Sequence, residues 1–119
     1  MSGETPAPVG PYRVAVRAGE WIVCSGQLGL RDGELVPGGV TAEFNQALAN
    51  LKDVLATERA TLADVVKTTV FLTDMAAFDE MNVAYSNGFG EFRPARSAVG
   101  VAALPRGGAV EIEAWARIS

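Results

Sequence analysis

The chain has 119 residues, of which 49% are hydrophobic and 20% charged, and its formal net charge is −4. This length and composition predict a single folded domain over residues 1–119, with a hydrophobic core. The acidic balance argues against a nucleic-acid partner, because nucleic-acid-binding proteins usually present a basic patch. No uninterrupted apolar run approaches the length of a membrane span, so we expect no membrane partner.

The sequence contains no histidine and one cysteine, Cys24. These counts exclude Ser-His-Asp and Cys-His catalysis and leave a Cys/His zinc site without ligands. An all-carboxylate magnesium or calcium site remains open, but no EF-hand or P-loop spacing is present, so no metal or other cofactor is expected. A lone cysteine and an N-terminus without the build of a signal peptide favour a cytoplasmic location.

Hydrophobic periodicity predicts the elements of secondary structure. Residues 1–10, rich in Pro, Gly and small residues, are typical of a loose arm. The expected elements are strands over 13–17 and 21–25, a small hairpin over 30–36, a helix over 41–57 capped by Thr41, a turn capped by Thr61, a strand over 65–73, a helix over 76–89, and strands over 95–101 and 110–118. This order predicts an α+β sandwich, with one mixed β-sheet and two helices on one face.

Arg96 is the first candidate functional residue. Two-residue periodicity places it on one strand face with Ala98 and Gly100, whose side chains are small or absent. A guanidinium in such surroundings can hold a carboxylate through two parallel hydrogen bonds. From this stretch alone, a simpler interpretation is that Arg96 pairs with a structural glutamate or reaches water.

Two other places carry candidate polar groups. Ser25-Gly26 ends an apolar strand and offers a hydroxyl and an accessible backbone N–H, although a plain strand-ending turn explains the pair equally simply. In the last strand, Glu111, Glu113 and Trp115 share the face opposite its apolar residues. This face is either solvated or covered by another subunit.

A simple hairpin between the last two strands, turning at Arg106-Gly107, would separate Arg96 from Glu111. Arg96 would lie opposite residues 116–118, about 15–20 Å from Glu111 along the strands. One small ligand could not touch both groups within one chain. The spacing therefore predicts that a site shared by Arg96 and Glu111 is built between subunits.

Six motifs, in the same order, resemble the YjgF/RidA family, which is also known as endoribonuclease L-PSP. They are Gly10-Pro11-Tyr12, Cys24-Ser25-Gly26-Gln27, Val66-Lys67-Thr68-Thr69-Val70-Phe71, Asn82, Pro94-Ala95-Arg96-Ser97 and Glu111-Ile112-Glu113-Ala114. The resemblance covers nearly the whole chain. It implies a chorismate-mutase-like α+β fold and a homotrimer with clefts between neighbouring subunits. It also implies hydrolysis of 2-imino acids, such as 2-iminobutanoate and 2-iminopropanoate, to 2-keto acids and ammonia.

The resemblance further implies roles for individual residues. Arg96 would bind the substrate carboxylate, and Glu111 would position or activate water, or transfer a proton. The substrate-binding pocket would be shaped by Tyr12, Ser25, the Gly26 N–H, Asn82, the backbone of Ala98, and Pro105. Many members have cysteine where this chain has Ala98, so thiol chemistry is excluded at that position. Val14 and the short loop before Arg96 also depart from the family and bear on substrate preference.

Three other functions remain open. The first is a trimer that only binds small carboxylates or keto acids, using the same Arg96 cleft. The second is ribonuclease activity or inhibition of translation, against which the acidic balance and the missing histidines count. The third is a holdase or redox-activated chaperone, which would need exposed apolar surface or oxidisable side chains.

Overall fold

The computed structural model describes residues 6–119, so the first five residues of the predicted arm lie outside the described part. Residues 6–13 carry no helix or strand. The strands are β1 (Ala15–Ala18), β2 (Trp21–Leu28), β3 (Leu30–Arg31), β4 (Glu34–Leu35), β5 (Val65–Leu72), β6 (Ala95–Gly100) and β7 (Val110–Arg117). The helices are α1 (Gly39–Thr57) and α2 (Phe78–Phe89), with short 3-10 turns at Leu62–Asp64, Met75–Ala77 and Pro105–Gly107.

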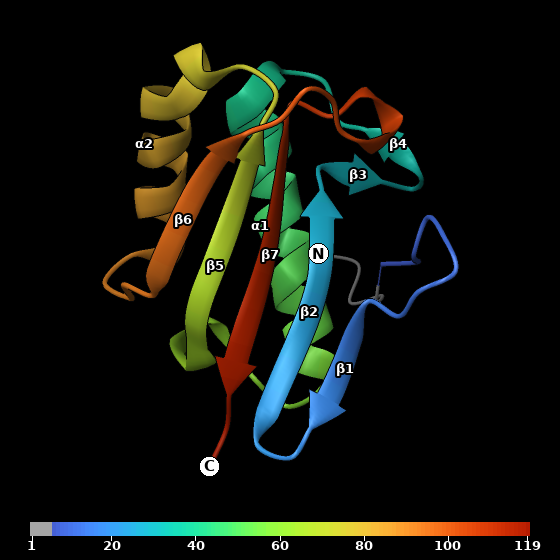
Figure 1. Cartoon of the computed structure of the whole chain (residues 1–119), viewed down its shortest axis with the longest axis vertical. Coiled ribbons are helices and arrows are strands. Elements are labelled where there is room, and N and C mark those ends of the chain that lie inside the picture. Colours follow the sequence, from blue (N-terminus) through green and yellow to red (C-terminus); the bar gives the residue numbers. More distant parts are fainter. Residues whose placement is uncertain (1–5) are drawn as a thin grey trace.

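Five strands form one sheet in the order β1-β2-β7-β5-β6, and β3 pairs with β4 beside it. β5 and β6 run parallel, whereas the other neighbours in the sheet are antiparallel, so the sheet is mixed. Both helices lie behind the sheet in Figure 1, and the strands in front are left open. The predicted α+β architecture, with two helices on one face of a mixed sheet, is confirmed.

The predicted hairpin between the last two strands is wrong. β6 is an edge strand that pairs only with β5, and β7 is inserted between β2 and β5. The physical reason is the helix between β5 and β6: a strand-helix-strand unit returns the chain parallel to its first strand. Residues 101–109 then carry the chain across the end of β5 to begin β7 (Figure 1).

The core lies between the sheet and the helices. The predicted alternation in β7 is confirmed, because the side chains of one face are fully buried: Val110, Ile112, Ala114 and Ala116. α1 buries the apolar stripe that its periodicity predicts, with Phe44, Leu51 and Leu55 all inaccessible to solvent. Within residues 6–119, neither helix is long and apolar enough to cross a membrane.

α1 begins two residues before the predicted cap. Gly38, with a φ of 117°, occupies the N-cap position, and Thr41 lies inside the first turn. The backbone N–H and the hydroxyl of Thr41 both donate to Glu80 Oε2, at 3.2 and 2.8 Å. A carboxylate from α2 therefore accepts hydrogen bonds from the first turn of α1. The local sequence around Thr41 does not predict this contact, because Glu80 lies 39 residues away. The cap predicted at Thr61 is confirmed, since it forms a reciprocal capping box with Asp64.

Candidate functional site

The predicted site residues fall into two groups in the structure. The clamp group, on α2 and β6, consists of Asn82, Arg96 and Ala98, together with Tyr85. The pocket group, on the N-terminal arm, β2, β7 and the turn before β7, consists of Tyr12, Gly26, Pro105 and Glu111. Ser25 lies next to the pocket group without lining the pocket.

Arg96 projects from β6 towards α2. It pairs with Thr68 of β5, whose side chain is fully buried on the helix-covered face. Its Nη1 donates to Asn82 Oδ1 at 2.7 Å, and its guanidinium carbon lies 4.8 Å from the centroid of the Tyr85 ring. A second ring, Phe78, lies 5.7 Å away. The guanidinium is therefore oriented by an amide and an aromatic face before any ligand arrives.

Most donors of this guanidinium are left for a ligand. Arginine carries five N–H donors, and among the described residues only Asn82 accepts from Arg96. No ion pair between described residues includes Arg96. A structural carboxylate, the simpler interpretation from sequence, does not pair with Arg96 within residues 6–119.

Tyr85 is the supporting residue that the sequence interpretation missed. Its ring stacks on Phe89 with centroids 4.4 Å apart, and its hydroxyl shares a 2.7 Å hydrogen bond with Thr68 Oγ1. Burial raises the pKa of Tyr85, and this is partly offset by the Thr68 bond and by the charge of Arg96. Tyr85 is not among the candidate residues singled out from the sequence. Its position one helical turn after Asn82 was the available signal that both could reach the same partner.

Ala98 follows Arg96 on the same face of β6 and is half-buried against the core, opposite Val70 of β5. Its methyl group offers no polar atom, so any contact with a ligand there would come from the backbone. The role predicted for the Ala98 backbone stays a prediction.

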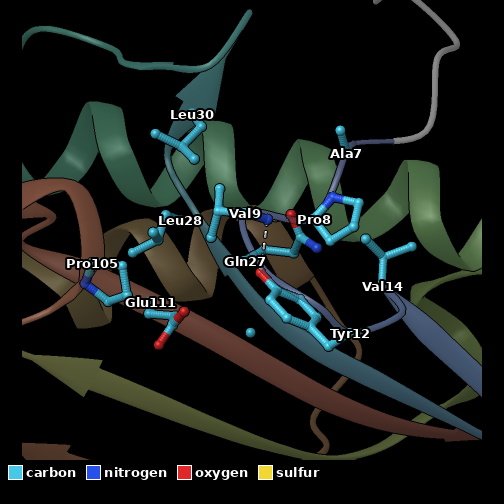
Figure 2. A pocket seen from close by; sticks show the side chains of 11 residues that line it. Ala7, Pro8, Val9, Tyr12, Val14, Gln27, Leu28, Leu30, Pro105 and Glu111 are labelled. Carbon is cyan, nitrogen blue, oxygen red and sulfur yellow. Dashed lines mark hydrogen bonds between the residues drawn. The ribbon is translucent and has the colours of Figure 1, made fainter.

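The pocket group surrounds a cavity of about 220 Å³ on the open face of the sheet (Figure 2). Its walls come from the arm and the segment that leads into β1, from β2, β3 and β7, and from the turn before β7: Ala7, Pro8, Val9, Tyr12, Val14, Gly26, Gln27, Leu28, Leu30, Pro105 and Glu111. Most of these side chains are apolar. The Tyr12 hydroxyl accepts a hydrogen bond from the Val9 N–H at 3.2 Å, which folds the arm over the cavity.

A β-bulge in β2 brings Gly26 against Glu111. Cys24 pairs with Ala114 and Gln27 with Ile112, so β2 has one residue more than β7 between these pairs. A Cβ added to Gly26 would lie 2.7 Å from the Glu111 carboxylate. Glycine is therefore needed here for the close approach of Glu111. The predicted contact between the Gly26 N–H and a ligand stays a prediction.

The hydroxyl of Ser25 is engaged away from the pocket. Its Oγ donates to the Arg13 carbonyl at 2.6 Å, and its backbone N–H donates to the Val14 carbonyl at 2.9 Å. Ser25 thus ties β2 to the segment that leads into β1. Its predicted contact with a ligand stays a prediction.

Glu111 carries the charge of the pocket. Burial raises the pKa of this carboxyl group, and the negative charge of Glu113 raises it further. No hydrogen bond from another described residue reaches its side chain, so its oxygens are available to a ligand or water. In the described part of the chain, no three His, Cys, Asp or Glu side chains gather closely enough to hold a metal ion.

The clamp and pocket groups cannot meet within one chain. Arg96 pairs with Thr68, which pairs with Ala114, so Glu111 lies two strands across and three residues along the sheet. This places the two Cα atoms about 14 Å apart, and the side chains leave opposite faces. The predicted distance of 15–20 Å along the strands is therefore too large, because three residues span only about 10 Å. The two groups are kept apart instead by the intervening strand β5 and by the pleat of the sheet.

Comparison with known proteins agrees with this fold. Residues 2–118 match the family described as Endoribonuclease L-PSP. The chain is 50% identical over 115 residues to the mouse protein named 2-iminobutanoate/2-iminopropanoate deaminase, covering 95% of this chain and 85% of the mouse protein. The crystal structure of RidA from an Antarctic Psychrobacter species superimposes with a TM-score of 0.93 at 41% identity, covering 99% of this chain and 97% of that one. The YjgF gene product of E. coli does so with a TM-score of 0.91 at 38% identity, covering 99% and 96%. The motifs, the fold and these matches together place the chain in the Endoribonuclease L-PSP family, among the YjgF/RidA proteins.

Proposed function

We propose that this protein is a hydrolase that converts 2-imino acids, such as 2-iminobutanoate and 2-iminopropanoate, to 2-keto acids and ammonia without a cofactor. The observation that carries the proposal is the clamp at Arg96, whose guanidinium contacts Asn82 and Tyr85 while most of its donors have no partner within residues 6–119. The names of curated relatives that are 43–50% identical support the reaction class.

Arg96 binds the substrate carboxylate in this proposal. A guanidinium matches a carboxylate with two parallel hydrogen bonds and fixes the plane of the ligand. Because Asn82 and the Tyr85 ring already orient the side chain, little side-chain entropy is lost when the ligand binds. The carbon next to the carboxylate is then held at a defined place in the cleft.

Glu111 handles water and protons. Water oxygen bonds to the electrophilic iminium carbon while Glu111 accepts a water proton. The proton returns to the nitrogen. As the carbon–nitrogen bond breaks, the remaining hydroxyl proton passes to Glu111, and the 2-keto acid and ammonia leave. A raised pKa brings this carboxyl closer to the range where it can both accept and release a proton. Holding the water molecule in line with the iminium carbon further accelerates the hydrolysis.

A homotrimer would bring Arg96 and Glu111 together, with the clamp group of one subunit facing the pocket group of its neighbour. The open face of the sheet supports such an assembly, because it exposes a T-shaped pair formed by Trp21 and Trp115, with ring centroids 6.2 Å apart. Trp115 is 47% exposed and Trp21 37%. Exposed aromatic side chains of this kind mark surfaces that are covered by a partner.

The first experiment couples an amino-acid oxidase to this protein and follows the decay of 2-iminopropanoate against its rate in water. Acceleration that Arg96→Ala abolishes in an assembly of unchanged mass would support the proposal. The contrary result is no acceleration with several imines. Tight binding of keto acids in that case would favour a binding protein that uses the same clamp.

Subunit complementation tests the site between subunits. Arg96→Ala and Glu111→Ala chains are mixed at equal amounts, denatured and reassembled together. If each site takes Arg96 from one subunit and Glu111 from the next, about a quarter of the sites regain both residues. Absence of any regained activity, with native mass showing mixed trimers, would place both residues in one subunit's site.

A further inference from the structure

A polar stripe on α1 has no part in the mechanism proposed above. Glu43, Gln46 and Asn50 are spaced by three and four residues, so they share one face of the helix. Glu43 is only 8% exposed and Asn50 only 7%. Burying an amide or a carboxylate is costly unless hydrogen bonds compensate it, so the partners of this stripe indicate what it does.

At its C-terminal end the stripe holds one wall of the pocket. Asn50 Nδ2 donates to the carbonyls of Leu28 and Leu30, at 3.1 and 2.9 Å. Its Oδ1 accepts from Gln46 Nε2 at 2.9 Å, and Gln46 Oε1 in turn accepts from Arg31. Leu28 and Leu30 both line the pocket. Asn50 therefore connects α1 directly to the β2–β3 wall.

At its N-terminal end the stripe holds the opposite wall. Glu43 Oε1 accepts a hydrogen bond from the Ala109 N–H at 2.8 Å, and the Ala109 carbonyl accepts from the Thr73 N–H at 3.2 Å. Ala109 is thus fixed on both sides, four residues after Pro105 and two before Glu111. Gly29 packs closely on the backbone of Glu43: a Cβ added to Gly29 would lie 2.5 Å from the Glu43 carbonyl oxygen.

We propose that Glu43 is a positioning residue for the pocket group, which acts by holding Ala109 and so fixes Pro105 and Glu111 against the β2 bulge. The consequence for turnover rests on the proposed function, whereas the effect on local structure does not. The stripe reaches the pocket group and not the clamp group. Loss of Glu43 should therefore impair the step that uses Glu111 and leave carboxylate binding by Arg96 nearly unchanged.

Three variants separate positioning from general stability. Glu43→Met fills similar space without an oxygen acceptor, whereas Glu43→Gln keeps an acceptor oxygen at similar reach. Leu51→Ala, on the same helix and fully buried among apolar residues, is the matched destabilising control. Glu43→Asp keeps a carboxyl group but shortens the side chain by about one carbon–carbon bond, so the carboxyl group no longer reaches the Ala109 N–H. This variant is used in place of Glu43→Met if Glu43→Met does not fold.

Two readouts are measured well below each melting temperature. Hydrogen exchange followed by mass spectrometry reports on residues 104–111, and steady-state kinetics reports kcat and KM for 2-iminopropanoate. We expect Glu43→Met to speed exchange over 104–111 and to lower kcat about tenfold or more, with KM changed less than about threefold. Glu43→Gln should stay near wild type in both, and Leu51→Ala should show no selective change over 104–111.

The outcomes distinguish the two proposals. Unchanged exchange over 104–111 in Glu43→Met would overturn the positioning role, whatever the enzyme turns over. A loss of kcat that Leu51→Ala reproduces, or a loss that falls on KM alone, would also overturn it. If the wild type hydrolyses no imine, the proposed function fails, while selective exchange over 104–111 would still support the anchoring of the pocket by Glu43.

Discussion

In the clamp group a cationic side chain has a hydrogen-bond partner, Asn82, whereas in the pocket group the carboxyl side chain of Glu111 has none among the described residues. Arg96 lies on the helix-covered face, in contact with Asn82 and the Tyr85 ring. Glu111 lies on the open face, close to the backbone of Gly26 and in a pocket whose walls are mostly apolar. The two groups occupy opposite faces of the same sheet and share no side chain.

The surroundings of the two groups affect different properties: the direction of the Arg96 guanidinium and the pKa of the Glu111 carboxyl group. A guanidinium stays charged at any physiological pH, so the surroundings of Arg96 need only fix its direction. A carboxyl can gain or lose a proton, and the surroundings of Glu111 raise its pKa by burial and by the charge of Glu113. In the proposed mechanism, these surroundings suit the clamp group to orienting a ligand and the pocket group to transferring a proton.

The largest effect is expected at the centre of the clamp group. Arg96→Lys keeps the charge but loses the planar fork, so we expect kcat/KM to fall about 100-fold, equivalent to about 2.7 kcal/mol. Arg93→Ala is the control, because its guanidinium bonds only to the carbonyls of Gly90 and Phe92 in the described structure. Kinetics with the coupled oxidase assay checks both. Near-normal turnover by Arg96→Lys would show that orientation is not the role of the clamp group.

Gly26→Ala tests the close approach in the pocket group. The new methyl group would overlap the Glu111 carboxylate, which must move, so we expect kcat to fall about tenfold or more. A double-mutant cycle with Glu111→Ala checks the cause, because the methyl group then has no carboxylate to displace. Equal losses from Gly26→Ala in both backgrounds would mean that the bulge acts through something other than Glu111.

Tyr85→Phe separates orientation from stability within the clamp group. The ring remains under Arg96, so kcat/KM should stay within about threefold, but the buried Thr68 hydroxyl loses its partner. We expect unfolding free energy to fall by about 1–2 kcal/mol in chemical denaturation. Adding Thr68→Val, which removes the orphaned hydroxyl, should recover part of this loss. No recovery would indicate that the hydrogen bond is not the cause.

The smallest effect is expected from the charge of Glu111 on stability. Folding raises the pKa of Glu111, so its protonated form contributes stability that is fully present below the unfolded pKa and is lost as pH rises through the folded pKa. Glu111→Gln should therefore gain stability relative to wild type between about pH 4 and neutral pH. Chemical denaturation at fixed protein concentration, at both ends of this window, measures the difference. A difference that does not change with pH would contradict the assigned cause.

Much of the fold could be predicted from local patterns. The alternation that begins at Val110 identified β7 and its buried face, and the helical spacing of Phe44, Leu51 and Leu55 identified α1. The position of β7 inside the sheet could not be predicted, because pairing with β2 and β5 joins residues far apart in the chain. The simplest local connection, a hairpin, was consequently the wrong one.

The sequence by itself determined the chemistry that is available: no histidine, one thiol, an arginine beside small residues and a glutamate in an alternating strand. Only the tertiary structure decided how these groups are held. Periodicity tells which side chains point inward but not what they meet. The Tyr85 ring under Arg96, the Gly26 backbone against Glu111 and the Glu43 bond to Ala109 arise because separate elements pack together, and packing is non-local.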